Sequence, residues 1–196
     1  MPIATARVSP TAPSAAELEA LIARAVTGDG QAFAALYRAH ADGVHALLTR
    51  LVGPRSERED LLQDVFVRFH RALPTYRGEA AVSTFLHRIT VRVAIDHLRA
   101  RRRRPDTSSA FAEDVADLAA PADQRLVQRA EVEQALAFLD RLEAKPRIAF
   151  ILREVLDLSY PEIAHLMGSF TTTARMRVAA AHRALAQLAP DLRRSR

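Results

Sequence analysis

The chain contains no cysteine and no tryptophan, and only 6 of its 196 residues are glycine. The lack of cysteine excludes disulfides and thiolate metal sites, and it is typical of proteins from a reducing cytosol. Aromatic residues make up only 6% of the chain, whereas alanine, leucine and arginine are abundant. This composition favours helices over sheets, so we expect an all-α fold.

Long apolar runs are also missing. No stretch approaches the ~20 consecutive apolar residues that a membrane-spanning helix requires. The first twenty residues lack the apolar core of a secretory signal. We therefore expect a soluble, cytoplasmic protein that does not insert into membranes.

The charge of the chain is positive overall and unevenly distributed. There are 28 Lys and Arg residues against 23 Asp and Glu residues, a net charge of +5. This balance is compatible with a nucleic-acid partner, but it does not establish one, because local clusters matter more than the total.

Changes in composition divide the chain into two small helical domains joined by a flexible linker. The segment 105–126 mixes Pro, Ser, Ala and Asp without an apolar period, as linkers do. The expected order is a disordered tail (1–13), a first domain (14–104), the linker (105–126), a second domain (127–190) and a basic tail (191–196). Expected helices span 14–26, 31–52, 60–73, 83–104, 128–142, 146–156, 161–167 and 171–188.

Four serines mark expected helix starts. Ser14 with Glu17, Ser56 with Glu59, and Ser159 with Glu162 have the spacing of capping boxes, in which each side chain bonds the other residue's backbone amide. Ser83 is the expected N-cap of the helix that follows it.

The helix that begins near Ser83 has an apolar stripe and a basic stripe. At about 100° per residue, Leu86, Ile89 and Val93 share one side. Another side carries Arg88, Arg92 and Arg99. Three spaced arginines alone fit a solvated face, but the following run Arg101–Arg104 repels itself unless phosphate neutralises it. Binding to a polyanion is therefore favoured.

The helix before it concentrates acidic residues in its first turns. Glu59, Asp60 and Asp64 stabilise a helix start through its dipole, which explains much of the clustering. A divalent metal site is the alternative, but Glu59 and Asp60 diverge by about 100° and no second ligand cluster follows. The sequence also lacks nucleotide-binding and hydrolase motifs. We expect no catalytic site, metal or cofactor.

Near the C-terminus, the pattern of helix, glycine turn and second helix predicts a helix-turn-helix. Small and apolar residues of the second helix form its inner side, namely Ala174, Val178, Ala181, Leu185 and Leu188. Its outer side carries Thr171, Thr172, Arg175, His182 and Arg183. A polar outer face suits docking in the major groove, and an ordinary amphipathic terminal helix is the alternative.

Two stretches resemble a known family. EDLLQDVFVRFHRAL (59–73) and PTYRGEAAVSTFLHRITVRVAIDHLRARRRR (74–104) resemble conserved region 2 of bacterial sigma-70 factors, and the closest group is the extracytoplasmic-function (ECF) group. LREVLDLSYPEIAHLMG (152–168) resembles region 4 of the same family. The two stretches together, in this order along the chain, are a specific signature of this family.

The resemblance implies three binding surfaces. Core RNA polymerase is expected to contact the acidic helix, whose Phe66 is expected to be an exposed aromatic. The positions are Glu59, Asp60, Gln63, Asp64 and Phe66. The promoter −10 element, as a single strand, is expected at Tyr76, Arg77, Phe85, Arg88, Arg92 and Arg99. Duplex DNA at −35 is expected at Thr171, Thr172, Arg175, Arg177, His182 and Arg183. By analogy, an anti-sigma factor is a further expected partner.

Two departures from the family pattern affect these expectations. Phe85 stands where tryptophan is usual, so the surface on which bases can stack is smaller. The stretch Gly168–Arg177 replaces a G-V-P-x-G-T-V-K-S-R pattern, which puts −35 sequence preference in question. The competing interpretation is an autonomous helix-turn-helix regulator, which needs neither the acidic helix nor the arginine helix.

Overall fold

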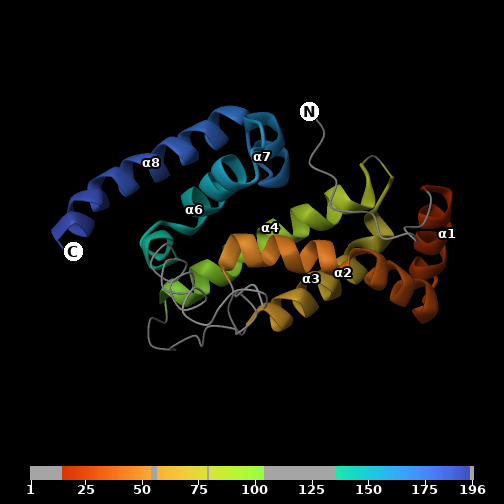
Figure 1. Cartoon of the computed structure of the whole chain (residues 1–196). Helices are drawn as coiled ribbons and strands as arrows, with labels where there is room; N and C mark the ends of the chain where they lie inside the picture. Colours follow the sequence, from red (N-terminus) through yellow and green to blue (C-terminus); the bar gives the residue numbers. More distant parts are fainter. Residues whose placement is uncertain (1–14, 54–56, 79, 104–135, 195–196) are drawn as a thin grey trace, which may run out of the picture.

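The computed structural model describes residues 15–53, 57–78, 80–103 and 136–194. Within these ranges every regular element is helical, which confirms the all-α expectation. The first group of helices is α1 (Ala15–Val26), α2 (Gly30–Val52), α3 (Arg58–Ala72), the 3₁₀ turn η1 (Leu73–Thr75) and α4 (Val82–Arg103). A helical segment at 136–140 precedes the second group. That group is α6 (Ala144–Phe150), the π-helical turn η3 (Ile151–Val155), α7 (Tyr160–Leu166) and α8 (Thr171–Arg194) (Figure 1).

The first group is built on contacts among α2, α3 and α4, and α1 crosses one end of α2. Leu36, Leu48 and Phe69 are completely buried between these helices. Leu86 and Val93, from the predicted apolar stripe of α4, are each 1% exposed. Burial of large apolar side chains is the main force that holds the three helices together.

The second group packs α6 and α7 against α8. Ala174, Val178 and Ala181 face this core and are almost fully buried, as their spacing predicts. Small residues allow the backbones of neighbouring helices to approach closely, so the short helices α6 and α7 lie directly on α8.

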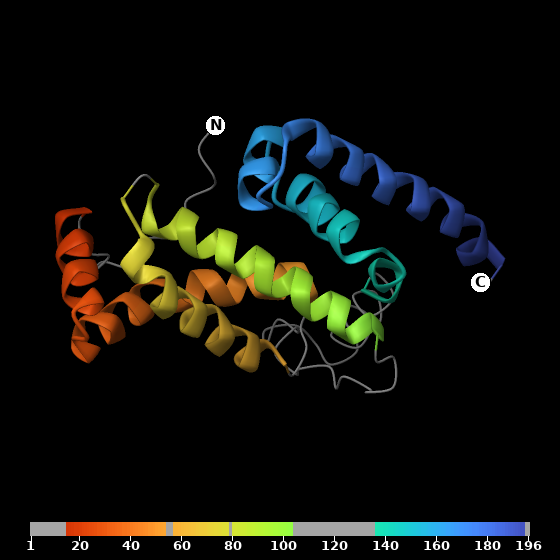
Figure 2. The same cartoon turned by 180° about the vertical axis from the view of Figure 1, so that it is seen from behind.

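The two groups also pack on each other. α4 contacts both α6 and α7. The second group lies along α4 in both the front view of Figure 1 and the back view of Figure 2. Buried residues of both groups form one continuous apolar cluster. The sequence pattern did not predict this packing. The linker predicted at 105–126 lies outside the described residues.

One close approach joins the two groups at the end of α2. Gly53 has φ +92°, a conformation that residues with a side chain rarely adopt. A Cβ atom at this position would lie 2.7 Å from Cδ2 of Leu136, closer than such atoms pack. Glycine therefore both ends α2 and makes room for Leu136.

The helix starts agree only partly with expectation. The capping box at Ser159 is confirmed, since Glu162 Oε2 accepts from the Ser159 amide at 2.7 Å and Ser159 Oγ accepts from the Glu162 amide at 3.4 Å. The unpredicted cap is Asp29, whose Oδ1 accepts from the amides of Gln31 and Ala32.

Two predicted N-caps are wrong. α4 begins at Val82, because the Phe85 amide already donates to the Ala81 carbonyl, so Ser83 lies inside the first turn. α3 has Glu57 as its N-cap, with no side-chain hydrogen bond, and Ser56 lies outside the described residues. In both cases the helix starts at a neighbouring residue although a good capping side chain is present.

The helix predicted at 146–156 is also modified. It begins at Ala144 and changes to π-helical geometry, so the Leu156 amide donates to the Ile151 carbonyl, five residues earlier. Within the described residues, no helix is both long and apolar enough to cross a bilayer.

Candidate nucleic-acid interface

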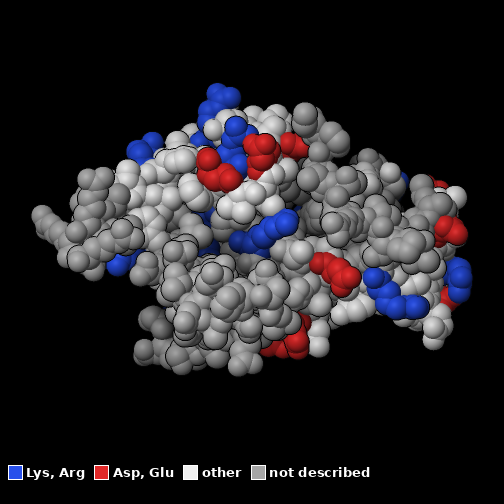
Figure 3. Space-filling view, viewed as in Figure 1, with Lys and Arg blue, Asp and Glu red and all other residues white. Residues whose placement is uncertain are grey.

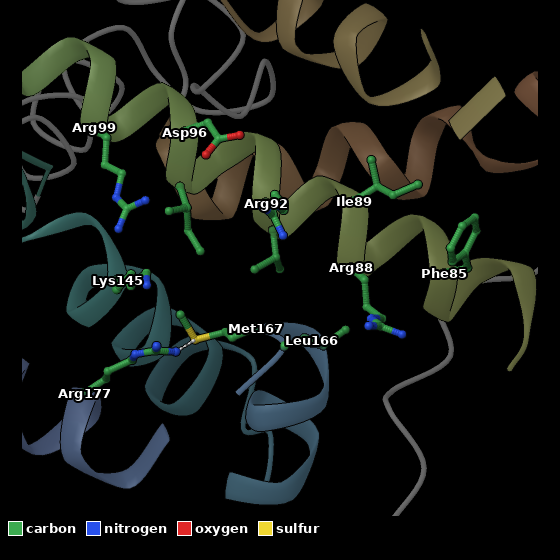
Figure 4. A pocket seen from close by; sticks show the side chains of 13 residues that line it. Phe85, Arg88, Ile89, Arg92, Asp96, Arg99, Lys145, Leu166, Met167 and Arg177 are labelled. Atoms are coloured by element: carbon green, nitrogen blue, oxygen red, sulfur yellow. Dashed lines mark hydrogen bonds between the residues drawn. The ribbon is translucent and has the colours of Figure 1, made fainter. Parts of the chain in front are cut away.

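The arginine stripe of α4 faces the second helical group. Arg88, Arg92 and Arg99 are exposed, and their side chains point into the space between α4 and the α6–α8 group (Figure 4). The opposite side of α4, including Leu86 and Ala94, is buried in the first core. The predicted two-sided character of this helix is therefore present, and its basic side lines a cavity of about 410 Å³.

Two aromatic rings lie where α4 begins. The ring centroids of Tyr76 and Phe85 are 5.3 Å apart, and Phe69 supports Phe85 from below at 6.1 Å. The Tyr76 hydroxyl donates to the Ala80 carbonyl at 2.5 Å, which fixes the loop, and burial raises the pKa of that hydroxyl. Both rings are half-buried and Arg77 is exposed, so flat aromatic and guanidinium groups adjoin the arginine stripe.

The acidic start of α3 is exposed, but part of its charge is neutralised. Glu59, Asp60 and Gln63 lie at the surface. Asp64 pairs with Arg68 at 2.9 Å, and Arg68 also donates to Asp96 of α4 at 2.9 Å. The bond to Asp96, followed by that to Asp64, raises the pKa of Arg68. The unpaired acidic surface therefore lies at the first turn.

The expectation that Phe66 is exposed is wrong, since its side chain is only 3% exposed. Tyr37 of α2 covers it at a centroid distance of 4.5 Å and is itself 37% exposed. Tyr37, Phe66, Gln63 and Val67 line a shallow cavity of about 390 Å³. Sequence reasoning missed Tyr37 because its exposure depends on how α2 and α3 pack.

The outer side of α8 carries the predicted polar residues. Thr171, Thr172, Arg175, His182 and Arg183 are all exposed. The Arg175 guanidinium lies 5.2 Å from the ring centroid of Tyr160, a cation–π contact that orients it. His182 hydrogen-bonds Glu154 at 3.0 Å, which anchors the far end of this surface to η3.

Arg177 lies on a different side of α8 from Arg175, because residues two apart on a helix diverge by about 200°. Its side chain is half-buried, points toward α4, and donates to Ser169 Oγ at 3.1 Å (Figure 4). Burial, and then the charge of Arg99, lowers the pKa of Arg177. Arg177 therefore does not lie on the outer side of α8 with the other residues expected to contact duplex DNA at −35.

Large apolar groups flank this outer surface. Phe170, in the turn before α8, is 82% exposed and Met176 is 70% exposed. Neither was predicted to contact a partner. Phe170 belongs to the stretch that departs from the family pattern, and that departure is the only sequence signal that could have identified it.

Charged groups are mixed over the molecule. On the face shown in Figure 3, basic side chains are visible where the α6–α8 group meets the remainder, and acidic ones lie on both sides of that junction. Within the described ranges, no three His, Cys, Asp or Glu side chains come together in a way that could hold a metal ion.

Comparison with known proteins places both halves in one family. The model of sigma-70 region 2 matches residues 36–104, and the model of sigma-70 region 4 matches residues 133–185. The RNA polymerase sigma-H factor of Pseudomonas aeruginosa is 34% identical over 84% of this chain and 90% of its own length. The ECF RNA polymerase sigma-E factor of Haemophilus influenzae is 34% identical over 82% of this chain and 88% of its own.

Solved structures agree on the fold. CnrH, in complex with the cytosolic domain of CnrY, has a TM-score of 0.58 at 21% identity and covers 89% of this chain and 98% of its own. The sigma factor RpoE of Bartonella quintana, in complex with the anti-sigma factor NepR, has a TM-score of 0.52 at 22% identity, covering 81% and 96%. With both regions matched in the expected order, the chain belongs to the sigma-70 family, among the ECF RNA polymerase sigma factors.

Proposed function

We propose that this chain gives core RNA polymerase its promoter specificity, with α3 binding the polymerase, α4 holding the melted −10 strand and α8 reading duplex DNA at −35. The observation that carries this proposal is the continuous surface of Tyr76, Phe85 and the arginines of α4. Half-buried rings followed by a row of guanidinium groups are what an unpaired strand requires.

Strand opening without ATP requires that unpaired bases gain partners in the protein. The Tyr76 and Phe85 rings offer stacking surfaces, and stacking contributes about 1–3 kcal/mol per base. Arg88, Arg92 and Arg99 then neutralise successive phosphates along about 16 Å of helix, since eleven residues rise 1.5 Å each. This track faces the α6–α8 group, so the strand enters when that group moves away from α4.

Duplex recognition falls to the outer side of α8. A helix whose polar side is exposed beyond a capped turn has the geometry for the major groove. Arg175 is held by the Tyr160 ring and has a free guanidinium edge for a guanine or a phosphate. Thr171 and Thr172, at the start of the helix, are placed for backbone contacts.

The polymerase surface combines the exposed acidic turn of α3 with the Tyr37 cavity. Carboxylates of Glu59 and Asp60 suit a basic helical partner, and Tyr37 supplies an apolar anchor of the kind that dominates interfaces. We assign the chain no active site of its own, and we place it in the cytoplasm with the polymerase. An anti-sigma protein is a further proposed partner, in line with the complex that the related RpoE forms.

The test is transcription in vitro with core polymerase over a promoter library, together with co-purification in the absence of DNA. We expect the chain to bind core without DNA and to give defined start sites. Replacing Arg88 and Arg92 by alanine should reduce permanganate-reactive open complex more than closed-complex binding. Specific duplex binding without core, and no transcript with it, would instead identify an autonomous regulator.

A further inference from the structure

The cavity between α4 and the second group has a strong excess of positive charge. Its lining includes Arg88, Arg92 and Arg99 from α4, together with Lys145 and Arg177 from the second group, against one carboxylate (Figure 4). Among the described lining residues, five cations and one anion give a formal charge of +4 around about 410 Å³. Such a concentration of like charge is unfavourable unless an anion is present.

The single carboxylate in this lining is already engaged elsewhere. Asp96 accepts from Arg68 at 2.9 Å, and in Figure 4 its carboxylate is turned away from the cations. Within the described ranges, the hydrogen bonds of the Arg177 guanidinium go to uncharged groups, Ser169 Oγ and, at 3.9 Å, Met167 Sδ. Among the described residues, no acidic side chain lies within ion-pair distance of the other four cations. The cavity therefore lacks a counter-ion from this part of the chain.

The effect of this repulsion is visible at Lys145. The charge of Arg177, followed by burial and the charges of Arg99 and Arg92, lowers the pKa of the Lys145 ammonium. The cations thus oppose the packing of the two groups, although apolar contacts and ion pairs hold them together. A multivalent anion would convert this repulsion into attraction.

We propose that this cavity binds a polyphosphate, a linear chain of phosphoryl groups that is either free or carried by a nucleotide, and that the bound chain holds the α6–α8 group against α4. Guanidinium groups bind phosphate oxygens in a bidentate manner, and four of the five cations are arginines. The α4 cations extend over about 16 Å, so a chain of phosphates contacts more of them than a single phosphate does.

Occupation of the cavity has a consequence for DNA. Arg88, Arg92 and Arg99 are the residues proposed to follow the melted strand, so one arginine row cannot serve both ligands. Binding of polyphosphate does not depend on the proposed function, whereas this competition does. Polyphosphate should therefore inhibit open-complex formation by keeping the two groups closed.

Lys145 offers a direct test, because it is the only lysine of the chain. Reductive methylation with ¹³C-formaldehyde labels this side chain and the α-amine, and it preserves the charge. We expect tripolyphosphate, added at constant ionic strength, to shift the Lys145 resonance saturably and to raise its pKa. Orthophosphate should act only at much higher concentration. Parallel titrations with tripolyphosphate and with ATP, both without magnesium, distinguish a free chain from a nucleotide.

The matched variants are Lys145→Gln and Arg38→Gln, which remove the same charge inside and outside the cavity. Arg38 is exposed on α2, where it donates to the Ala34 carbonyl. By calorimetry, tripolyphosphate should bind Lys145→Gln about tenfold more weakly, the effect of losing one hydrogen bond between charged groups. Arg38→Gln should bind as the unmodified chain does. Equal losses in both variants, or no preference over orthophosphate, would overturn the site.

Transcription assays separate this proposal from the proposed function. Without polyphosphate, Lys145→Gln should support normal run-off transcription, and with polyphosphate it should resist inhibition. If neither protein supports transcription, the proposed function fails while calorimetric binding still decides the site. If both proteins are inhibited equally, the competition through this cavity is refuted.

Discussion

Arg101, near the end of α4, forms an ion pair with Asp140, and the Nη2–Oδ2 distance is 2.7 Å. The same carboxylate accepts from Arg147, which is 1% exposed and also donates to the Val52 carbonyl at the end of α2. One aspartate therefore connects the arginine helix to the second helical group.

Replacing Asp140 by asparagine should destabilise this junction. Arg147 would remain charged and buried while losing the carboxylate of Asp140, and weakening a buried ion pair costs free energy of folding. Because Asp140 is 25% exposed, the effect should be smaller than for a fully buried pair. We expect the free energy of unfolding, measured in urea, to fall by about 2 kcal/mol. The radius of gyration in X-ray scattering should also increase.

The control for this change is Glu143→Gln. Glu143 pairs with Arg102 across the same junction at 2.6 Å, but both side chains are largely exposed. Exposed pairs contribute only about 0–1 kcal/mol. Equal effects of the two substitutions would show that Asp140 has no special role in holding the groups together.

Reversing the charge of Asp60 should weaken binding to core polymerase. Asp60→Lys places a cation in the exposed acidic turn without disturbing the Asp64–Arg68 pair. We expect an affinity loss of about tenfold, because a rim charge acts mainly on association. The melting temperature should fall only slightly, through the lost interaction with the helix dipole. Asp42→Lys, on an exposed part of α2, makes the same charge change outside the proposed surface. Equal losses of affinity in the two variants would show that the acidic turn only stabilises its own helix.

The role of Arg175 can be determined by its salt dependence. If the residue reads guanine, Arg175→Ala should cost about 1–3 kcal/mol on the preferred −35 sequence and relax that preference. If it contacts phosphate, affinity should fall for all sequences and the salt slope should decrease by about one. We expect the first result, and Tyr160→Leu should reproduce part of it because the Tyr160 ring orients the guanidinium. Uniform loss with the smaller slope would contradict base reading.

Two half-buried histidines, His40 and His87, should make the first helical group sensitive to acid. Burial lowers the pKa of His87 and of His40, where the charge of His87 adds to the effect. Below the ordinary value of 6.5, the unfolded chain therefore binds more protons than the folded one. Stability should be greatest above pH 6.5 and should fall as the pH drops from there toward the lowered values.

The measurement is urea unfolding between pH 7.5 and pH 5.5. His87→Gln should show a smaller decrease over this range than the unmodified chain. His165→Gln, at an exposed position on α7, serves as the control and should retain the full decrease. Identical pH profiles for all three proteins would refute the role of the half-buried imidazoles.

Local features of this protein could be predicted from the sequence. The Ser159–Glu162 capping box and the buried stripe of α8 depend on residues within two turns of one another, so spacing suffices to find them. Arg177 could have been excluded from the outer surface by the same arithmetic, since it lies about 200° from Arg175.

Features that depend on distant contacts could not be predicted in this way. Phe66 is buried because Tyr37, from another helix, covers it. The cavity at Lys145 exists only because the second group lies on α4, and no periodicity within either group encodes that packing. Asp140 likewise gains its importance from Arg101 and Arg147.

The contact between Gly53 and Leu136 limits how this protein can be recombined with its relatives. Exchanging the second helical group for that of a relative is an obvious route to sigma factors with new promoter preferences. A donor domain with a bulkier residue at the position of Leu136, or a recipient with alanine at 53, would place atoms in the same space. Functional hybrids should therefore be obtained when the glycine and its leucine are inherited as a pair.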